Sequence, residues 1–512
     1  MEIFDLLLQG LYVSILPANL VSCTIGVIIG TLIGVLPGID TISTIALLLP
    51  FSYTMSSTAA LIMFAGIYYG SKYGGSTTSI LLNVPGEAAS VVTCLDGYPM
   101  SQRGRAGAAL SVSAIGSFIA STIGVIGLTL FAPPLAQAAL VFGPPEYFAL
   151  ALVGIIILTN LTGTSTLKSM MMVSTGIMLG TVGLDSLSGI SRLTMGVPEL
   201  DRGFELSILA MGIFGIGEIL TVMTKPTTPP TLPSIKMRDL YPTKEEWRRS
   251  VPPMFRGGVV GFLVGLLPGP AATISSFASY ALEKRLSKNP AEFGQGAIEG
   301  VAGPESANNS AVSATMIPLL SLGLPFCGAT AILLSGFMIH GITPGPALIT
   351  EQPGMFWGLI ASMYIGNILL LIINLPLIGI FVQMLKTPLN ILMPIIALLT
   401  LTGAYSINNS MSDLVLIVIC GVIGFFLRRT GFEPGPLLIG VILGPSLEQG
   451  LVRGLIICDG DIWAMISRPI SSMLLTIGAL VIVYNVTSWF IKTNKRRKEA
   501  SCVSTGDHKA NG

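Results

Sequence analysis

A nine-residue segment occurs twice in this chain, once in each half. The first copy, GTLIGVLPG, spans residues 30–38, and the second, GFLVGLLPG, spans residues 261–269. Six of the nine positions are identical, and a Thr-Ile-Ser triplet follows each copy, at residues 41–43 and 273–275. In a membrane, a Pro-Gly break within an apolar run is tolerated only where protein or water satisfies the freed backbone groups. Paired breaks in two halves of a chain indicate a transporter's binding site, although a single copy is equally typical of an ordinary helix end.

The composition is that of a membrane protein, because 51% of the 512 residues are hydrophobic and only 10% are charged. Soluble domains carry about 25% charged residues, and a membrane span needs about 20 apolar residues. Apolar stretches of roughly this length lie at residues 106–131, 167–184, 205–223, 257–282, 355–381, 411–427 and 470–490. Counting shorter Gly- and Pro-broken segments as well, we predict an all-α polytopic membrane protein with about 11–13 membrane segments, some of them discontinuous helices or re-entrant hairpins.

Other features of the composition narrow the class of function. The net charge of +1 predicts no nucleic-acid partner, and the six cysteines lack the spacing of a metal site or a disulfide framework. The first residues contain no basic segment typical of a cleaved signal peptide, so we expect the first span to be retained. The sequence contains no nucleophile elbow, HExxH motif or phosphate-binding loop. It therefore offers no recognisable set of catalytic residues.

The chain divides into two halves joined by a polar segment. We expect a first transmembrane repeat at residues 1–224, a basic, Pro-rich cytoplasmic linker at 225–256, and a second transmembrane repeat at 257–491. The basic tail, residues 492–512, is expected to be disordered and cytoplasmic. Inverted repeats are common among transporters built on discontinuous helices, and we favour that arrangement over parallel repeats.

Two long polar, glycine-rich stretches lie among the apolar runs, at residues 68–100 and 294–326. Freed backbone N–H groups at half-helix N-termini bind carboxylates, whereas carbonyls, hydroxyls and amides are hard oxygen ligands suited to an alkali cation. We therefore expect a small anion and a coupling cation, sodium being the one metal anticipated, with no other cofactor. The candidate substrate- and ion-binding residues are Pro37, Gly38, Ser76, Thr77, Asn83, Pro85, Gly86, Glu87, Pro268, Gly269, Glu305, Ser306, Asn308, Asn309 and Pro325.

Several charged or titratable residues near these stretches have two interpretations. Glu87 and Glu299, like Glu305, could each hold an ion or proton, or cap a half-helix near the interface. Asp96 is expected in a loop or turn. Lys72 could pair with substrate, but we favour a side chain that snorkels to the interface. His340 is expected to be a structural hydrogen-bonding residue rather than a proton relay.

The polar motifs closely resemble those of a known transporter family. The resemblance is carried by the segments YGGSTTSILLNVPGEAASVVTCLDGYPM, EGVAGPESANNSA and HGITPGPAL, together with the repeated LPG. It is to the large membrane subunit of the tripartite tricarboxylate transporters (TctA-like). This resemblance implies a bacterial inner-membrane permease that works with a small four-helix membrane subunit and a periplasmic solute-binding protein. It also implies a carboxylate substrate and uptake driven by a sodium or proton gradient.

One position departs from the family pattern. Residues 325–328 read Pro-Phe-Cys-Gly, whereas the family tends to have glycine and then a small polar residue after the proline. Phe326 does not reach the φ > 0 conformations open to glycine, so the departure bears on a tight backbone contact and on the substrate pocket, and we infer no specific substrate from the resemblance.

The function that this sequence favours is the permease subunit of a secondary transporter that imports a small di- or tricarboxylate. Two alternatives remain at this point. An ion or solute channel would need a continuous polar pore lining, and an intramembrane enzyme would need a reactive pair of side chains within the spans.

Overall fold

The structure is a computed structural model in which a large part of the chain is described. The described residues are 2–36, 41–83, 85–161, 166–185, 190–204, 206–224, 240–377 and 410–483, with isolated positions at 379, 393, 394, 397, 398, 401, 402, 405 and 487. The candidate break residues Pro37 and Gly38, the first part of the expected linker (225–239) and the expected tail (492–512) lie outside them.

Within the described residues the chain is helical apart from one two-stranded antiparallel sheet. The first half contains α1 (Glu2–Ile15), α2 (Pro17–Val35), α3 (Thr41–Ser52), α4 (Ser57–Leu82), η1 (Ala88–Ser90), α5 (Val91–Met100), η2 (Ser101–Arg105), α6 (Ala106–Ala139), α7 (Pro144–Leu161), α8 (Thr166–Gly180), β1 (Gly183–Leu184), β2 (Ser191–Arg192), η3 (Pro198–Arg202), α9 (Leu206–Ala210), η4 (Met211–Ile216) and α10 (Gly217–Met223).

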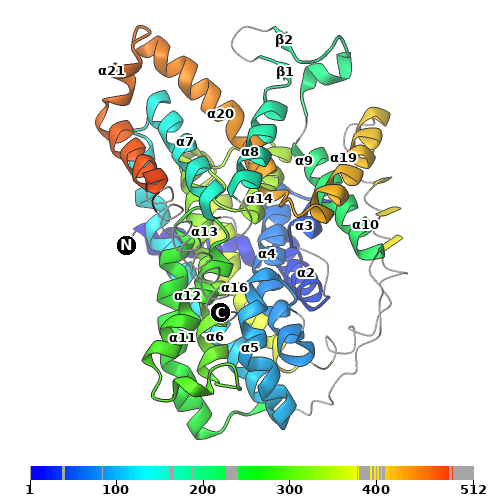
Figure 1. Ribbon diagram of the computed structural model, residues 1–512, viewed down its shortest axis with the longest axis vertical. Coiled ribbons are helices and arrows are strands. Elements are labelled where there is room, and N and C mark those ends of the chain that lie inside the picture. The colour runs from blue at the N-terminus through cyan, green and yellow to red at the C-terminus, as the bar shows by residue number, and fades with distance from the viewer. Residues whose placement is uncertain are drawn as a thin grey trace, which may run out of the picture.

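The second half begins with a long helix and ends in a helix that has no label in Figure 1. Its elements are α11 (Lys244–Gly265), α12 (Ala271–Leu286), η6 (Pro290–Glu292), α13 (Glu299–Leu322), α14 (Gly328–Ile339), α15 (Pro346–Glu351), α16 (Pro353–Asn374), α19 (Met411–Arg429), α20 (Gly435–Ile457), α21 (Ile462–Ile466) and the helix Pro469–Val483.

Several of these helices are long and apolar enough to cross a membrane. Among the described residues five such segments are found, at Pro17–Val35, Ala88–Ala139, Pro353–Asn374, Met411–Arg429 and Gly435–Ile457. Shorter apolar helices accompany them, including α3 and α14. Apart from the short sheet, the fold of the described residues is therefore that of a helical, polytopic membrane protein, as the composition predicts.

The expected span at 257–282 is divided at the second LPG segment. α11 ends at Gly265 and α12 begins at Ala271, with Pro268 and Gly269 buried between them. α11 also begins earlier than expected, at Lys244, because Thr243 and Glu246 form a capping box at its N-terminus. The last part of the expected linker, residues 244–256, is thus the first part of this helix.

The repeated glycines allow two pairs of helices to cross closely. A Cβ on Gly30 of α2 would lie 2.6 Å from the Ile67 carbonyl oxygen of α4. A Cβ on Gly261 of α11 would lie 2.0 Å from the Ala307 carbonyl oxygen of α13. The same relation recurs one turn further along both pairs, for Gly34 with Ser71 and for Gly265 with Ala311. Side chains at these positions would collide with backbone, so the repeated glycines serve helix packing as well as the break that follows them.

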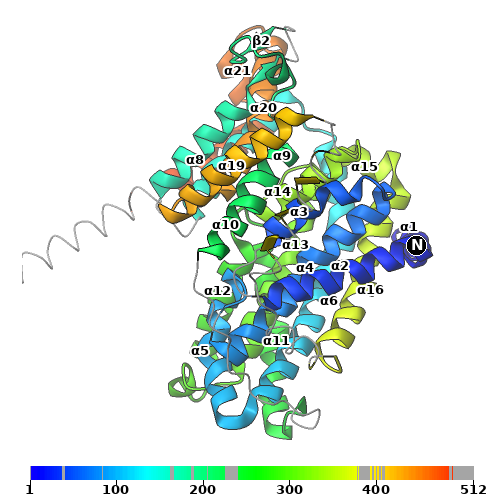
Figure 2. The same cartoon turned by 90° about the vertical axis from the view of Figure 1, so that its right-hand side faces the viewer.

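The polar stretches are buried helices within this packing. α4 is continuous to Leu82 and α13 to Leu322, and both lie inside the bundle. α13 packs along α6, α11 and α12, while α4 packs along α2. Figures 1 and 2 show α5 and α11 toward one end of the molecule and β1 and β2 at the opposite end. The breaks after α4, α11 and α13 lie between these ends, where a cavity forms.

Candidate functional site

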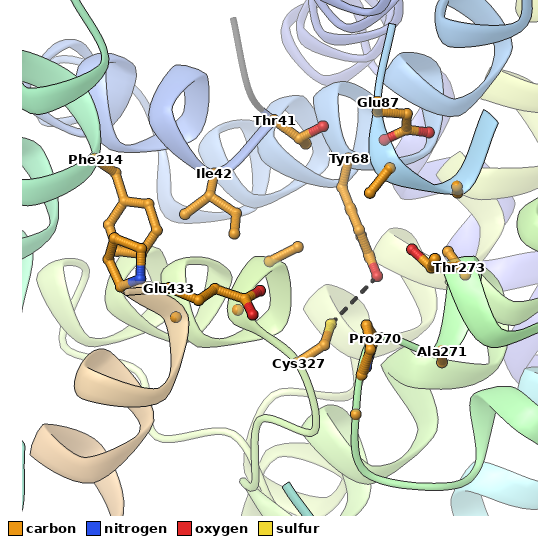
Figure 3. Close-up of a pocket in the computed structure, with 18 of the residues that line it drawn as sticks. Thr41, Ile42, Tyr68, Glu87, Phe214, Pro270, Ala271, Thr273, Cys327 and Glu433 are labelled. Carbon is orange, nitrogen blue, oxygen red and sulfur yellow. Dashed lines mark hydrogen bonds between the residues drawn. The ribbon is translucent and has the colours of Figure 1, made fainter. Parts of the chain in front are cut away.

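A cavity of about 420 Å³ lies where the beginnings of several helices meet (Figure 3). Its lining includes Thr41 and Ile42 of α3, residues 86–89 at η1, residues 270–273 at α12, residues 327–329 at α14 and residues 434–436 at α20. A helix N-terminus carries unpaired N–H groups and a positive dipole end, which favours a bound anion. The arrangement concentrates such ends from both halves of the chain around one space.

Two of the helix starts have nearly the same backbone geometry. Glu87, before η1, has φ −151° and ψ 168°, and Cys327, before α14, has φ −149° and ψ 168°. Each backbone N–H donates to a hydroxyl three residues later, on Ser90 at 3.3 Å and on Thr330 at 3.0 Å. The helices before the two turns also end in the same way. The residue after each helix, Asn83 after α4 and Gly323 after α13, has a left-handed backbone conformation.

The turn before α14 makes a close backbone contact at Phe326. The Gly269 N–H donates to the Phe326 carbonyl at 2.8 Å, which joins the second LPG break to this turn. Neither Gly86 nor Phe326 has a positive φ. Gly86 is required for space instead, because a Cβ there would lie 2.2 Å from the Gly34 carbonyl oxygen. The two turns therefore differ in packing, since Gly86 has no room for a side chain and the corresponding position in the second half has the side chain of Phe326.

A buried ion pair lies at the end of the cavity that η1 and α4, both from the first half of the chain, help to line. The Lys72 Nζ and the Glu87 carboxylate are paired, with side chains only 10% and 11% exposed, and both residues line the cavity. The interpretation of Lys72 as a snorkelling side chain was therefore wrong. The neighbouring Tyr68 hydroxyl hydrogen-bonds Thr315 Oγ1 at 3.0 Å and contacts Cys327 Sγ at 3.5 Å, so it connects α4 with α13 and α14 (Figure 3).

The other end of the cavity is formed by residues that were not among the candidate site residues. Phe214 and Glu433 lie there in Figure 3, away from Glu87 and Thr273. Glu218 of α10 and Arg428 of α19 also line the cavity and form an ion pair with each other. Arg428 directly follows the apolar stretch 411–427, and only the fold brings it to Glu218.

Glu305 belongs to a buried polar cluster behind the Lys72 end of the cavity. Its carboxylate accepts hydrogen bonds from the Thr93 hydroxyl and from Asn308 Nδ2, the latter at 3.2 Å. Asn309 Nδ2 donates to Ser117 Oγ at 2.8 Å. Glu305 is fully buried and close enough to Lys72 and Glu87 to interact electrostatically with them. The cluster thus brings together Glu305, Asn308 and Asn309, but none of them is among the residues that line the cavity.

The remaining candidate residues are divided between the cavity and its surroundings. Gly86, Glu87 and Gly269 line it. Ser76 and Thr77 are buried within α4, Pro268, Ser306 and Pro325 are buried near the breaks or within α13, and Asn83 and Pro85 are exposed. None of these seven is part of the lining, and Pro37 and Gly38 lie outside the described residues.

Asp96 corrects a further expectation, because it lies within α5 and is fully buried rather than in a loop. Its Oδ1 accepts backbone N–H groups from Gly294, Gly296 and Ala297 at 2.7–2.9 Å, and Tyr280 donates to its Oδ2 at 2.9 Å. Asp96 therefore fastens α5 to the segment before α13.

Glu299 and His340 have structural partners. Glu299, at the first position of α13, binds Arg249 with its two carboxylate oxygens at 2.7 and 2.8 Å. His340 Nε2 lies 3.1 Å from Ser52 Oγ, in agreement with the structural role expected for it.

Comparison with known proteins identifies the class of membrane protein that this fold and cavity represent. The model of the tripartite tricarboxylate transporter TctA family matches residues 20–439. A 52.8 kDa protein in the TAR-I ttuC' 3'region of Agrobacterium vitis, described as uncharacterized, is 47% identical over 483 residues, covering 94% of this chain and 96% of the relative. A second protein, in the TAR-II ttuC' 3'region, is 52% identical over 223 residues, covering 44% of this chain and 92% of the relative. No solved structure matches the chain.

The chain belongs to the TctA family of tripartite tricarboxylate transporters. It is therefore a membrane transport protein, not an enzyme, and a component of a tripartite system.

Proposed function

We propose that this chain is the permease subunit that carries a small di- or tricarboxylate across the membrane, with the cavity as its substrate site. The observation that carries the proposal is the convergence of helix N-termini on one cavity that also contains Lys72. A volume of about 420 Å³ falls within the range of about 300–1,000 Å³ typical of small-molecule sites. The backbone N–H groups in the first turns of α12 and α14 would bind carboxylate oxygens, and Lys72 would add positive charge.

We further propose that the Glu305 cluster binds the coupling ion, sodium or a proton. The cluster supplies a carboxylate and amide oxygens within a short stretch of α13. One of its buried oxygen atoms, Asn309 Oδ1, has no hydrogen-bond partner within the described part of the chain, and the same is true of Ser306 Oγ on the same helix. Oxygen atoms of this kind suit a dehydrated alkali cation. A cation bound here would lie close to Lys72 and Glu87, so it would influence the charge balance of the substrate site.

The two helix breaks support a repeated architecture, which we propose is inverted. α2 packs closely against α4 through glycines, and α11 packs against α13 in the same way. The turns that follow α4 and α13 have nearly the same backbone geometry. The repeats would be residues 1–224 and 257–491, and movement of the site-bearing elements against the rest would give alternating access.

We place the transporter in a bacterial inner membrane, with α5 and α11 toward the cytoplasm. The proposal rests on the basic residues near their ends, including Arg103, Arg105, Arg248 and Arg249, since cytoplasmic segments are enriched in Lys and Arg. The partners would be a small four-helix membrane subunit and a periplasmic solute-binding protein that delivers the carboxylate.

The test is uptake of labelled citrate and succinate into vesicles containing the three-part system. We expect accumulation only when a sodium or proton gradient is imposed, and loss of accumulation when the binding protein is omitted. Uptake that ignores both gradients and requires ATP would overturn the mechanism. Single-channel currents carried by the permease would instead favour a channel.

A further inference from the structure

The Glu218–Arg428 pair lies between two cavities rather than beside one. Both residues line the candidate substrate cavity, and both also line a second cavity of about 560 Å³ that includes Thr221 and Phe425. The pair is therefore the boundary that the two spaces share. A solute that passed from one cavity to the other would meet the Arg428 guanidinium.

The hydrogen bonding of Arg428 is incomplete. Its Nη1 pairs with Glu218, but its Nε and Nη2 are buried and have no partner within the described residues. The guanidinium lies over the Phe214 ring, 5.7 Å from its centroid. Buried donors without partners are costly, so a side chain in this state gains when an acceptor becomes available.

Other arginines of the same chain show what the Nε and Nη2 atoms of a guanidinium normally bind. Arg105, Arg249 and Arg256 each direct Nε and Nη2 at the two carboxylate oxygens of a glutamate. This two-point geometry is the preferred one for a carboxylate. In Arg428 the same two atoms are the ones without partners, although the side chain lines the substrate cavity.

The two ends of the cavity also differ in chemistry. Glu87 and the start of α12 lie at one end of the cavity and Phe214 lies at the other (Figure 3). Lys72 pairs with Glu87, and the Arg428 guanidinium lies over the Phe214 ring. A molecule with one carboxylate would satisfy one end alone. A di- or tricarboxylate has a further carboxylate group that can pair with the cation at the other end.

We propose that Arg428 binds a second carboxylate group of the substrate through Nε and Nη2, and so makes the site selective for di- and tricarboxylates over monocarboxylates. Because these atoms are covered in the present conformation, Arg428 must turn toward the substrate, and the link to Glu218 holds it until then. The inference rests on the proposed function, since it assigns a role in the same cavity.

The test measures binding to the full-length chain in lipid nanodiscs, using succinate, malate and citrate, with butyrate as the monocarboxylate. Arg428→Gln should weaken binding of the di- and tricarboxylates by at least about tenfold and leave butyrate within about twofold, because only a second carboxylate meets this side chain. Arg428→Lys should restore little, since a point charge lacks the two-point geometry. Arg429→Gln removes the same charge from the next, exposed position and should change no affinity.

Glu218→Gln separates a binding role from a structural one. It frees Arg428 without removing it, so we expect tighter binding of the dicarboxylates. In the Arg428→Gln variant the Glu218 carboxylate loses its ion-pair partner, which could itself change binding. The double variant Arg428→Gln/Glu218→Gln removes both charges and should still lack selectivity for di- and tricarboxylates over butyrate.

Two outcomes would overturn the inference. Equal affinity losses for butyrate and succinate in the Arg428 variants would assign the residue to folding alone, and no loss at all would remove it from the site. If the wild-type chain binds none of these compounds and the three-part system imports none, the proposed function itself fails. Wild-type binding that Arg428→Gln leaves intact removes only the present inference.

Discussion

The Nζ of Lys72 and the carboxylate of Glu87 form a buried ion pair that joins α4 to the turn before η1. Removal of one partner leaves a buried charge uncompensated, which typically costs about 3–5 kcal/mol. We therefore expect Lys72→Met or Glu87→Gln to lower the thermal unfolding temperature in nanodiscs and to abolish uptake. The double variant Lys72→Met/Glu87→Gln should recover most of the stability and none of the uptake. Recovery of uptake in the double variant would mean that the pair is only structural.

Glu305→Gln tests the proposed ion site while preserving the shape of the side chain. The amide can retain a hydrogen bond with Thr93, but it carries no charge to compensate a cation or accept a proton. We expect the variant to bind substrate and to lose the dependence of uptake on the sodium or proton gradient. Glu299→Gln is the matched control, because Glu299 lies on the same helix and pairs with Arg249 near its start. Unchanged gradient dependence in Glu305→Gln would move the coupling ion to another site.

The turns that contain Gly86 and Phe326 should differ in their tolerance of alanine. Gly86→Ala would bring a Cβ to 2.2 Å from the Gly34 carbonyl oxygen, so α2, α4 and the turn could not keep their present positions. We expect uptake to be lost. Phe326→Ala leaves intact the backbone carbonyl that accepts from Gly269, and should reduce uptake only a few-fold. Comparable loss in both variants, measured at equal membrane expression, would contradict this explanation.

The repeated glycines can be tested through helix packing alone. A Cβ on Gly261 would lie 2.0 Å from the Ala307 carbonyl oxygen, and overpacking against backbone costs about 1–3 kcal/mol or more. Gly261→Ala should therefore lower the unfolding temperature markedly. Gly154 of α7 is the control, since a Cβ there would meet only Leu443 at 4.0 Å. Gly154→Ala should be neutral or slightly stabilising, and equal effects of the two substitutions would exclude the packing role.

The sequence by itself determined the class of this protein and the location of its second helix break. Both depend on local chemistry: apolar runs must be buried in lipid or protein, and the segment at Pro268 and Gly269 cannot continue a regular helix. The motifs at residues 68–100 and 294–326 likewise identified the family that the comparisons then established. They also identified Glu305, Asn308 and Asn309 as neighbours, because residues three and four positions apart lie on the same face of a helix, about one turn from each other.

Only the tertiary structure decided which of these groups meet, and around which space. Lys72 lies opposite Glu87, Asp96 is buried beneath the segment before α13, and Arg428 reaches Glu218 from more than 200 positions away in the chain. Such pairs follow from how helices pack, and helix packing is set by close contacts such as that of Gly30 with Ile67. A charged residue near a helix end has the same local signature whether it faces water or a cavity, so the fold alone could assign Arg428 to the site.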